Sequence, residues 1–317
     1  MKKLKDCMPI INEMIQNLPP ERRMENIKKA VKVETKAKKP GLWFSNFEDE
    51  PVKEPLKTSY KFLKEVSGLS EGSFNVVAGR TGKGKTDLLI SLAADNLLNG
   101  YSIGFCLSEG KLSEYSSQLK YVLLERTKCR KTVEKLLDQV MGFTASSINV
   151  NSSYDYSYWV NSFYNSARFH KLNIIYLDNL STISFTNSTP EVESGFTEAL
   201  VRGASDNNVC VIAAIHPIKS LNPNVEITKD QFRGNASHVN MATNVFALNN
   251  FDNINSGLRI IKTLKSRYFG EKEGKCFELK FKKLKFRGFY KSDSPINQIQ
   301  ARRYFADNYR RNPSGRN

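Results

Sequence analysis

One stretch of the chain has the residue types and the spacing of a phosphate-binding loop. Its eight residues match the pattern G-x-x-x-x-G-K-T and are Gly79, Arg80, Thr81, Gly82, Lys83, Gly84, Lys85 and Thr86. An apolar run at 74–78 precedes the loop and a helix-like run at 87–94 follows it, which is the strand–loop–helix context that this motif requires. In such a loop, backbone N–H groups and a helix N-terminus converge on one anion. We expect Lys85 to bind the β- and γ-phosphates of a nucleotide and Thr86 to bind Mg²⁺.

Three further polar residues follow apolar runs that read as buried strands. Asp178 follows Ile174–Leu177, Glu109 comes just after 102–107, and His216 follows 209–215. Asp178 is expected to organise Mg²⁺, Glu109 could take a proton from an attacking water, and His216 would face the terminal phosphate. Each has an ordinary alternative: a capping aspartate, a solvated loop acid and a structural histidine.

Two cations, Lys265 and Arg267, stand at the end of another predicted strand at 258–264. The alternation of side chains along a strand sends both to the same face. So placed, they could stabilise charge on a phosphoryl group bound by a neighbouring subunit, as an arginine finger does. The alternative is an exposed basic strand end, which is the commoner situation of Lys and Arg.

Apolar runs alternate with helix-like segments, and this predicts an α/β fold with a mostly parallel central sheet. The predicted strands are 76–78, 102–107, 172–177 and 209–215, and the predicted helices are 112–126 and 191–205. After residue 244 the pattern is β-rich, with strands at 244–248, 258–264 and 276–281. The basic segment 280–287 is expected to be mainly an edge strand whose lysines deter aggregation, and a nucleic-acid contact is the second interpretation. The predicted domains are a short helical extension or linker at 1–55, an ATPase domain at 56–290, and a basic, disordered tail at 291–317.

The composition indicates a partner that carries negative charge. The 317 residues have a formal net charge of +16 and a pI near 9.5, and such an excess usually accompanies nucleic-acid binding. No stretch has the continuous apolar length of a membrane span. The five cysteines are scattered and show no C-x-x-C spacing, so neither a zinc site nor a disulfide framework is indicated. We therefore expect a cytoplasmic protein with no membrane partner.

Taken in order, these features resemble the ATPase domain of hexameric replicative DNA helicases, the DnaB-like group of the RecA-like fold. They are most similar to the helicase portion of phage primase-helicases. The segments that carry the resemblance are 79–86, 107–109, 175–181, 214–219, 233–237 and 264–270. The resemblance implies a RecA-like P-loop ATPase core with a β-rich C-terminal end, and ATP and Mg²⁺ as cofactors. It also implies the roles of the site residues: Glu109 as catalytic base, Asp178 as the Mg²⁺ acid, His216 as γ-phosphate sensor, and Lys265 with Arg267 as the pair that acts in trans.

The resemblance further implies a homo-oligomer, a hexameric ring, that acts on single-stranded DNA in its central channel. The residues expected to contact DNA there are Lys219, Lys229, Arg233, Gly234 and Asn235. About fifty-five residues precede the motor, which is too short for a primase or a helical partner-binding domain, so a separate primase or loader is a possible partner. Two alternatives stay open. One is a RecA-like recombination or annealing ATPase that does not unwind DNA, and the other is a regulatory P-loop ATPase that acts on a protein partner.

Overall fold

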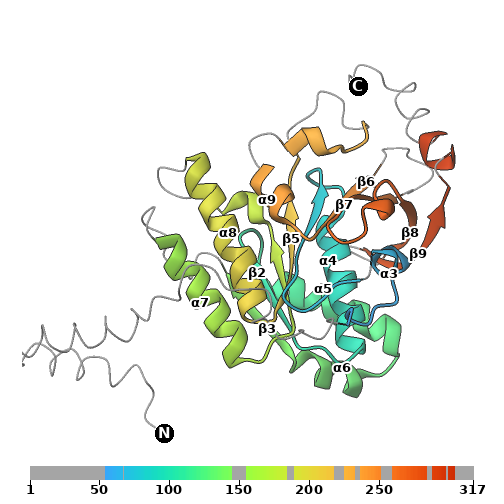
Figure 1. Ribbon diagram of the computed structural model, residues 1–317. Coiled ribbons are helices and arrows are strands. Elements are labelled where there is room, and N and C mark those ends of the chain that lie inside the picture. The colour runs from blue at the N-terminus through green and yellow to red at the C-terminus, as the bar shows by residue number, and fades with distance from the viewer. Residues whose placement is uncertain are drawn as a thin grey trace, which may run out of the picture. The chain divides into compact units, whose positions relative to one another are not determined.

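The computed structural model describes residues 54–66, 68–144, 155–183, 189–217, 225–232, 236–250, 259–283, 288–297 and 299–303. Within these residues, nine strands form a single sheet with helices on both of its faces (Figure 1). The helical extension expected at 1–55 lies outside the described residues except for its last two positions.

The sheet has the strand order β3-β2-β4-β5-β1-β6-β7-β8-β9. In chain order the strands are β1 (Phe74–Gly79), β2 (Ile103–Leu107), β3 (Val140–Thr144), β4 (Ile174–Asp178), β5 (Cys210–Ile215), β6 (Asn244–Asn250), β7 (Arg259–Ser266), β8 (Cys276–Lys283) and β9 (Gly288–Ile296). All pairings from β3 across to β6 are parallel, and those from β6 to β9 are antiparallel. This confirms the predicted α/β architecture with a mostly parallel sheet and a β-rich C-terminal end.

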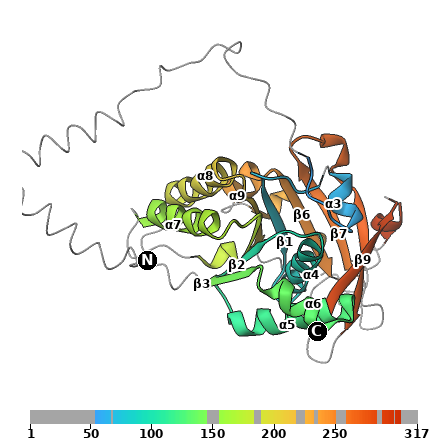
Figure 2. The same ribbon diagram turned by 90° about the horizontal axis from the view of Figure 1, so that it is seen from below.

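Helices cover the two faces of the sheet in separate groups. On one face lie α4 (Lys85–Leu98), α5 (Leu112–Thr127) and α6 (Arg130–Leu137), and on the other lie α7 (Asp155–Phe169), α8 (Pro190–Asp206) and α9 (Ala236–Met241), as the turned view makes clear (Figure 2). The short helix α3 (Lys61–Glu65) packs near β9. Successive residues of β4 point into opposite cores, Tyr176 into the α4 side and Leu177 into the α7 side. Because both faces are covered, the parallel strands read as unbroken apolar runs.

The strands and helices predicted from residue 56 onward are present, with ends within two residues of those expected, except that α4 continues four residues past the run at 87–94. Four elements before residue 170, namely α3, α6, β3 and α7, were not predicted. β3 is only partly buried along its length and contains Gly142, so it lacks the apolar run of an interior strand. The helix α7 is rich in Ser, Asn and Tyr, and only its buried aromatic residues, such as Trp159 and Phe163, reveal a helical period.

Of the edge strand predicted at 280–287, the structure describes Lys280 to Lys283, which end β8. β8 lies between β7 and β9, and β9 is the outermost strand of the sheet. The pairing with β7 stops at Leu279, so within the described residues Lys280 to Lys283 pair with β9 alone. β9 continues to Ile296, so the sheet extends past residue 290, where the sequence placed the start of the tail. The polar run in β9 concealed this strand. Its Pro295 is tolerated because an edge strand has one side without a hydrogen-bonding neighbour.

Candidate functional site

The strand order brings the predicted site residues to one edge of the sheet. β2, β4, β5 and β1 are neighbours and run parallel, so their carboxyl ends lie side by side. Leu107 is level with Asp178 across one pair, and Ala78 is level with Ile215 across another. Ligands of open α/β sheets bind at this edge. The order therefore places Glu109, Asp178 and His216 around the loop that follows Gly79.

The glycine-rich loop joins β1 to α4, as the motif predicts. Gly84, the residue before the helix, has a φ of +93°, which is the left-handed conformation that favours glycine. A Cβ atom at this position would lie 2.6 Å from the hydroxyl oxygen of Tyr290 in β9. The helix then begins at Lys85, and its first backbone N–H groups have no partner within the helix. These groups are available to an anion in the loop.

The Lys85 ammonium is folded back against the loop. Its Nζ atom donates to the carbonyl oxygens of Gly79 at 2.8 Å and Arg80 at 3.2 Å, and lies 3.0 Å from Nδ1 of His216. Burial lowers the pKa of Lys85 to about 8, and the carboxylates of Asp178 and Glu109 oppose part of that shift. Both carboxylates therefore lie close enough to interact electrostatically with the Lys85 ammonium, which agrees with their predicted places in the site.

The contact with Lys85 fixes the tautomer of His216. An ammonium group can only donate, so Nδ1 of His216 must be the acceptor and Nε2 must carry the proton. The 3.3 Å approach of Nδ1 to the carbonyl oxygen of Gly79 is then not a hydrogen bond. Burial, and secondly the charge of Lys85, lower the pKa of His216, which favours this neutral form. The backbone N–H of His216 donates to Oγ of Ser181 at 2.9 Å, so the end of β5 is tied to the segment after β4.

Asp178 and Thr86 meet directly. The Thr86 hydroxyl donates to Oδ2 of Asp178 at 2.8 Å, and the Tyr115 hydroxyl from α5 donates to the same oxygen at 2.5 Å. Asp178 is only 4% exposed, so this carboxylate is held by two hydroxyl groups in a buried position. Oxygen ligands of this kind suit Mg²⁺, which usually binds one or two carboxylates together with substrate phosphates.

Glu109 is exposed and stands two residues beyond β2. Its neighbour Ser108 joins the end of β2 to the end of β4 through hydrogen bonds. The backbone N–H of Ser108 donates to the carbonyl oxygen of Asp178 at 3.0 Å, and its Oγ donates to that of Asn179 at 2.6 Å. Glu109 therefore projects from an anchored turn at the open rim of the site, where a water molecule could reach it.

Sequence reasoning assigned no role to Tyr115, Ser108 or Ser181. Ser108 and Ser181 each lie within a segment that carries the resemblance, 107–109 and 175–181, but a single serine has no pattern of its own. The position of Tyr115 could have been found, because Tyr115, Leu119 and Val122 form the buried stripe of α5 at helical spacing. That stripe shows that Tyr115 points inward, although it does not reveal the carboxylate that its hydroxyl meets.

The residues present fit a Mg²⁺-bound phosphate ligand. The guanidinium atoms Nε and Nη2 of Arg80, inside the loop, are shielded from solvent and have no hydrogen-bond partner among the described residues. Burial lowers the pKa of Arg80, because the charged guanidinium is less stable away from water. A phosphate in the loop would supply the missing acceptors. The paired oxygens of Thr86 and Asp178 lie at the helix end where the accompanying metal would be expected.

The cations Lys265 and Arg267 lie together, as predicted, but not near this site. Both reach the last turn of α9. Lys265 Nζ donates to the carbonyl oxygens of Val239 at 3.1 Å and Asn240 at 2.6 Å, and Arg267 Nη2 donates to that of Met241 at 3.1 Å. Ser266, between them, pairs with Asn244, which is level with Asn75 at the start of β1. From Asn75 to Gly79 the strand rises by about 13 Å, so neither cation reaches the loop of its own chain.

Of the five residues predicted to contact DNA, Lys229 is described. It begins the 3₁₀ turn Lys229–Phe232 and pairs with Glu273 at 2.7 Å. Its charge also helps to lower the pKa of Lys265, after burial and the charge of Arg267, so Lys229 stands beside the cation pair. Lys219, Arg233, Gly234 and Asn235 lie outside the described residues.

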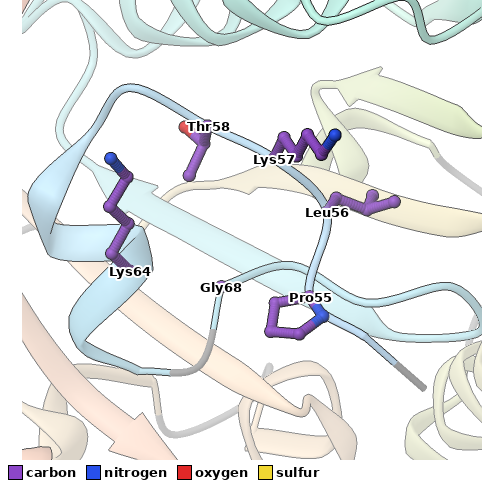
Figure 3. A pocket seen from close by; sticks show the side chains of 6 residues that line it. All are labelled: Pro55, Leu56, Lys57, Thr58, Lys64 and Gly68. Atoms are coloured by element: carbon purple, nitrogen blue, oxygen red, sulfur yellow. The ribbon is translucent and has the colours of Figure 1, made fainter.

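A pocket of about 410 Å³ lies elsewhere, lined by Pro55, Leu56, Lys57, Thr58, Lys64 and Gly68. Lys64 of α3 stands on one side and Pro55 with Leu56 on the other (Figure 3). Thr58 donates to Asp95, near the last residue of α4, at 2.8 Å. Because the glycine-rich loop is at the first residue of this 14-residue helix, the pocket is about 15 Å or more from the loop. It contributes nothing to the site described above.

Comparison with known proteins finds no family model and no curated protein sequence that matches this chain. Among the described residues, three or more His, Cys, Asp or Glu side chains nowhere gather in a group that could hold a metal ion by themselves. No helix in the part of the chain that the structure describes is long and apolar enough to cross a membrane.

Proposed function

We propose that this chain is an ATPase with a RecA-like P-loop core that works as a DNA helicase or translocase. The observation that carries the proposal is the meeting of Lys85, the Thr86–Asp178 pair, Glu109 and His216 at one edge of the parallel sheet. A glycine-rich turn alone matches by chance more easily than a turn that also has a buried carboxylate, a rim acid and a histidine at the correct neighbouring strands.

The geometry suggests what each residue does. Backbone N–H groups of the loop, Lys85 and Arg80 would bind the phosphates, and Lys85 would exchange its carbonyl contacts for phosphate oxygens. Thr86 and Asp178 would hold Mg²⁺, which when bound neutralises charge on the β- and γ-phosphates. Glu109 would orient the attacking water and accept its proton. His216 contacts Lys85, so it would lose this contact when Lys85 binds a terminal phosphate. The hydrogen bond from the backbone N–H of His216 to Ser181 would transmit the change to the segment after β4.

A ring of subunits would bring Lys265 and Arg267 of one chain to the glycine-rich loop of the next chain. Lys265 and Arg267 cannot reach their own loop, so a role in phosphoryl transfer requires the loop of a neighbouring chain. Such a head-to-tail interface closes into a ring when its rotation allows. The net charge of +16 favours a polyanionic substrate, and we propose single-stranded DNA in the channel of a hexameric ring. The core is expected to operate in the cytoplasm of its cell or host.

The test is ATP hydrolysis with and without single-stranded DNA, for the wild type and for Lys85→Ala, with unwinding of a forked duplex measured alongside. We expect DNA to stimulate hydrolysis and strands to separate, and Lys85→Ala to lose both. Lys83→Ala, changed in the same loop but not expected to replace Lys85 at the phosphates, is the matched control. Hydrolysis must fall with Lys85 far more than with Lys83 if the loop binds phosphate as proposed.

Other outcomes point to the alternatives. Stimulation by DNA without strand separation would indicate a recombination or annealing ATPase. Hydrolysis that ignores DNA at low salt would indicate a regulatory ATPase with a protein partner, since phosphate contacts make DNA affinity strongly salt-dependent. Absence of ATP binding and of hydrolysis in the wild type would reject the proposal altogether.

A further inference from the structure

The two cations assigned to act in trans are held by one short element, α9. Its last three residues, Val239, Asn240 and Met241, supply the carbonyl oxygens that accept from Lys265 and Arg267. These are carbonyls that a helix end leaves without partners inside the helix, and cations are favoured there. The position of the end of α9 therefore helps to determine where the two charged groups lie.

The contacts leave both cations able to bind something else. Lys265 has three N–H donors and uses two of them on α9, whereas Arg267 has five donors and the structure records one bond from its side chain. Arg267 is also exposed. The carbonyl oxygens of α9 thus fix the direction of the two side chains and leave some of their N–H groups free to donate to another acceptor.

A buried hydrogen bond fastens α9 to α8. Nδ1 of His238 in α9 lies 2.7 Å from Oγ1 of Thr197 in α8, and the two residues are 5% and 0% exposed. The Thr197 hydroxyl also donates to the carbonyl oxygen of Glu193 at 2.8 Å. A hydroxyl has a single proton, so Thr197 must accept from His238, and Nδ1 of His238 must carry a hydrogen.

The protonation of His238 is consistent with this assignment. Burial lowers the pKa of His238 to about 4, so the ring is neutral at pH 7 with its one proton on Nδ1. The bond is therefore a neutral, fully buried contact. Removing its acceptor would leave a buried N–H without a partner, which costs more than the bond itself contributes.

We propose that the Thr197–His238 hydrogen bond positions Lys265 and Arg267, by holding α9 on α8 so that the carbonyls at the end of α9 present the cation pair at a fixed place. Thr197 and His238 are positioning residues, since neither touches the cations. Any consequence for catalysis rests on the function proposed above, but the positional claim does not.

The test measures the position of Lys265 directly. The full-length protein is treated with an N-hydroxysuccinimide acetate ester, and the acylation rate of Lys265 is compared by mass spectrometry with that of Lys128, the residue after α5, on the other face of the sheet. Thr197→Val removes the hydroxyl at constant shape and should raise the ratio by at least about fivefold, because the buried N–H left without a partner costs more than one net hydrogen bond contributes. Thr197→Ser keeps the hydroxyl and should leave the ratio as in the wild type.

A second pair of variants covers the case in which Thr197→Val fails to fold. His238→Asn keeps an N–H donor close to the place of Nδ1 and should resemble the wild type, whereas His238→Leu should raise the Lys265 ratio. The proposal is overturned if Asn and Leu behave alike, if Val and Ser behave alike, or if the ratio does not change in either disruptive variant.

ATP turnover separates this inference from the proposed function. In an active protein, Thr197→Val should lower kcat while leaving nucleotide affinity unchanged, because the glycine-rich loop is untouched. A change in nucleotide affinity with kcat preserved would contradict the catalytic consequence. If the wild type does not hydrolyse ATP, the proposed function fails, and the acylation ratios still decide whether the hydrogen bond positions the cations.

Discussion

Nζ of Lys85 lies 3.0 Å from Nδ1 of His216, and both atoms also approach the carbonyl oxygen of Gly79. The lysine donates and the neutral histidine accepts, so each stabilises the charge state in which the other is found. This contact links the glycine-rich loop to the end of β5. A phosphate that draws Lys85 away would break it, which makes the pair a direct physical connection between ligand binding and the segment after β5.

The lowered pKa of Lys85 predicts that ATP binding depends on pH. In the free protein, Lys85 loses its proton as the pH rises through about 8, whereas bound phosphates would raise that pKa. Affinity is therefore full below pH 8 and declines above it, and ATP binding takes up a proton near pH 8. Calorimetric titrations at pH 8 in two buffers with different ionisation enthalpies measure this uptake. Lys85→Arg, which stays charged, should show none from this residue, and equal uptake in both proteins would contradict the prediction.

The bond from Tyr115 to Asp178 predicts a role for a residue that does not touch the nucleotide. Tyr115→Phe removes the hydroxyl that orients the carboxylate, and loss of such an outer contact typically costs 10- to 100-fold in metal affinity. We expect the Mg²⁺ concentration for half-maximal hydrolysis to rise by about tenfold. Tyr121→Phe, at a position 59% exposed on the same helix, is the matched control. An unchanged Mg²⁺ requirement in Tyr115→Phe would show that the contact is incidental.

How far the sequence predicted this fold depended on burial. Val211 and Ile212 occupy a strand covered on both faces, and their apolar run predicted β5 almost to the residue. β9 is an edge strand in which Lys291 is exposed, and edge strands carry polar residues that resemble a tail. The helix α7 was missed for a related reason, because polar residues are more numerous in it than the buried aromatic residues that mark its helical period.

The candidate site was predictable where chemistry requires a fixed spacing and less so where tertiary contacts create it. Lys85 and Thr86 follow from the motif, and Asp178 from its place after an apolar run. No local pattern indicates that Tyr115 meets Asp178 or that Thr197 accepts from His238, since these pairs are 63 and 41 residues apart. The strand order, which no segment specifies alone, also placed Arg267 beyond reach of its own loop.

The close approach of α7 and α8 predicts a destabilising effect at Gly203. A Cβ atom there would lie 2.2 Å from the ring of Tyr164, whose hydroxyl is already bonded to the carbonyl oxygen of Leu200 at 2.5 Å. In an open helix Gly→Ala stabilises by about 1 kcal/mol, but overpacking costs about 1–3 kcal/mol. Gly203→Ala should therefore lower the free energy of unfolding in urea. Gly270→Ala, with no atom within 4 Å of the added Cβ, should be near neutral, and a stabilised Gly203→Ala would refute this packing.

The distance of Arg267 from its own loop predicts that it completes the site of another subunit. Arg267→Ala should lose ATP turnover and keep nucleotide binding, because the residues that hold the phosphates are unchanged. Loss of binding as well would place Arg267 in the site of its own chain, against the strand register that separates them. Equilibrium binding of a fluorescent ATP analogue, measured beside hydrolysis, distinguishes the two.

A mixing experiment makes the assignment to a neighbouring subunit decisive. Lys85→Ala and Arg267→Ala subunits are each expected to be inactive alone. In a random equimolar ring, about a quarter of the interfaces combine an intact loop from one variant with an intact Arg267 from the other, so turnover should reappear. The control mixes Lys85→Ala with the double variant Lys85→Ala/Arg267→Ala, which cannot form an intact site. If the first mixture stays as inactive as its parents although the subunits exchange, Arg267 does not act across an interface. The distance of Arg267 from its own loop would then no longer support a ring.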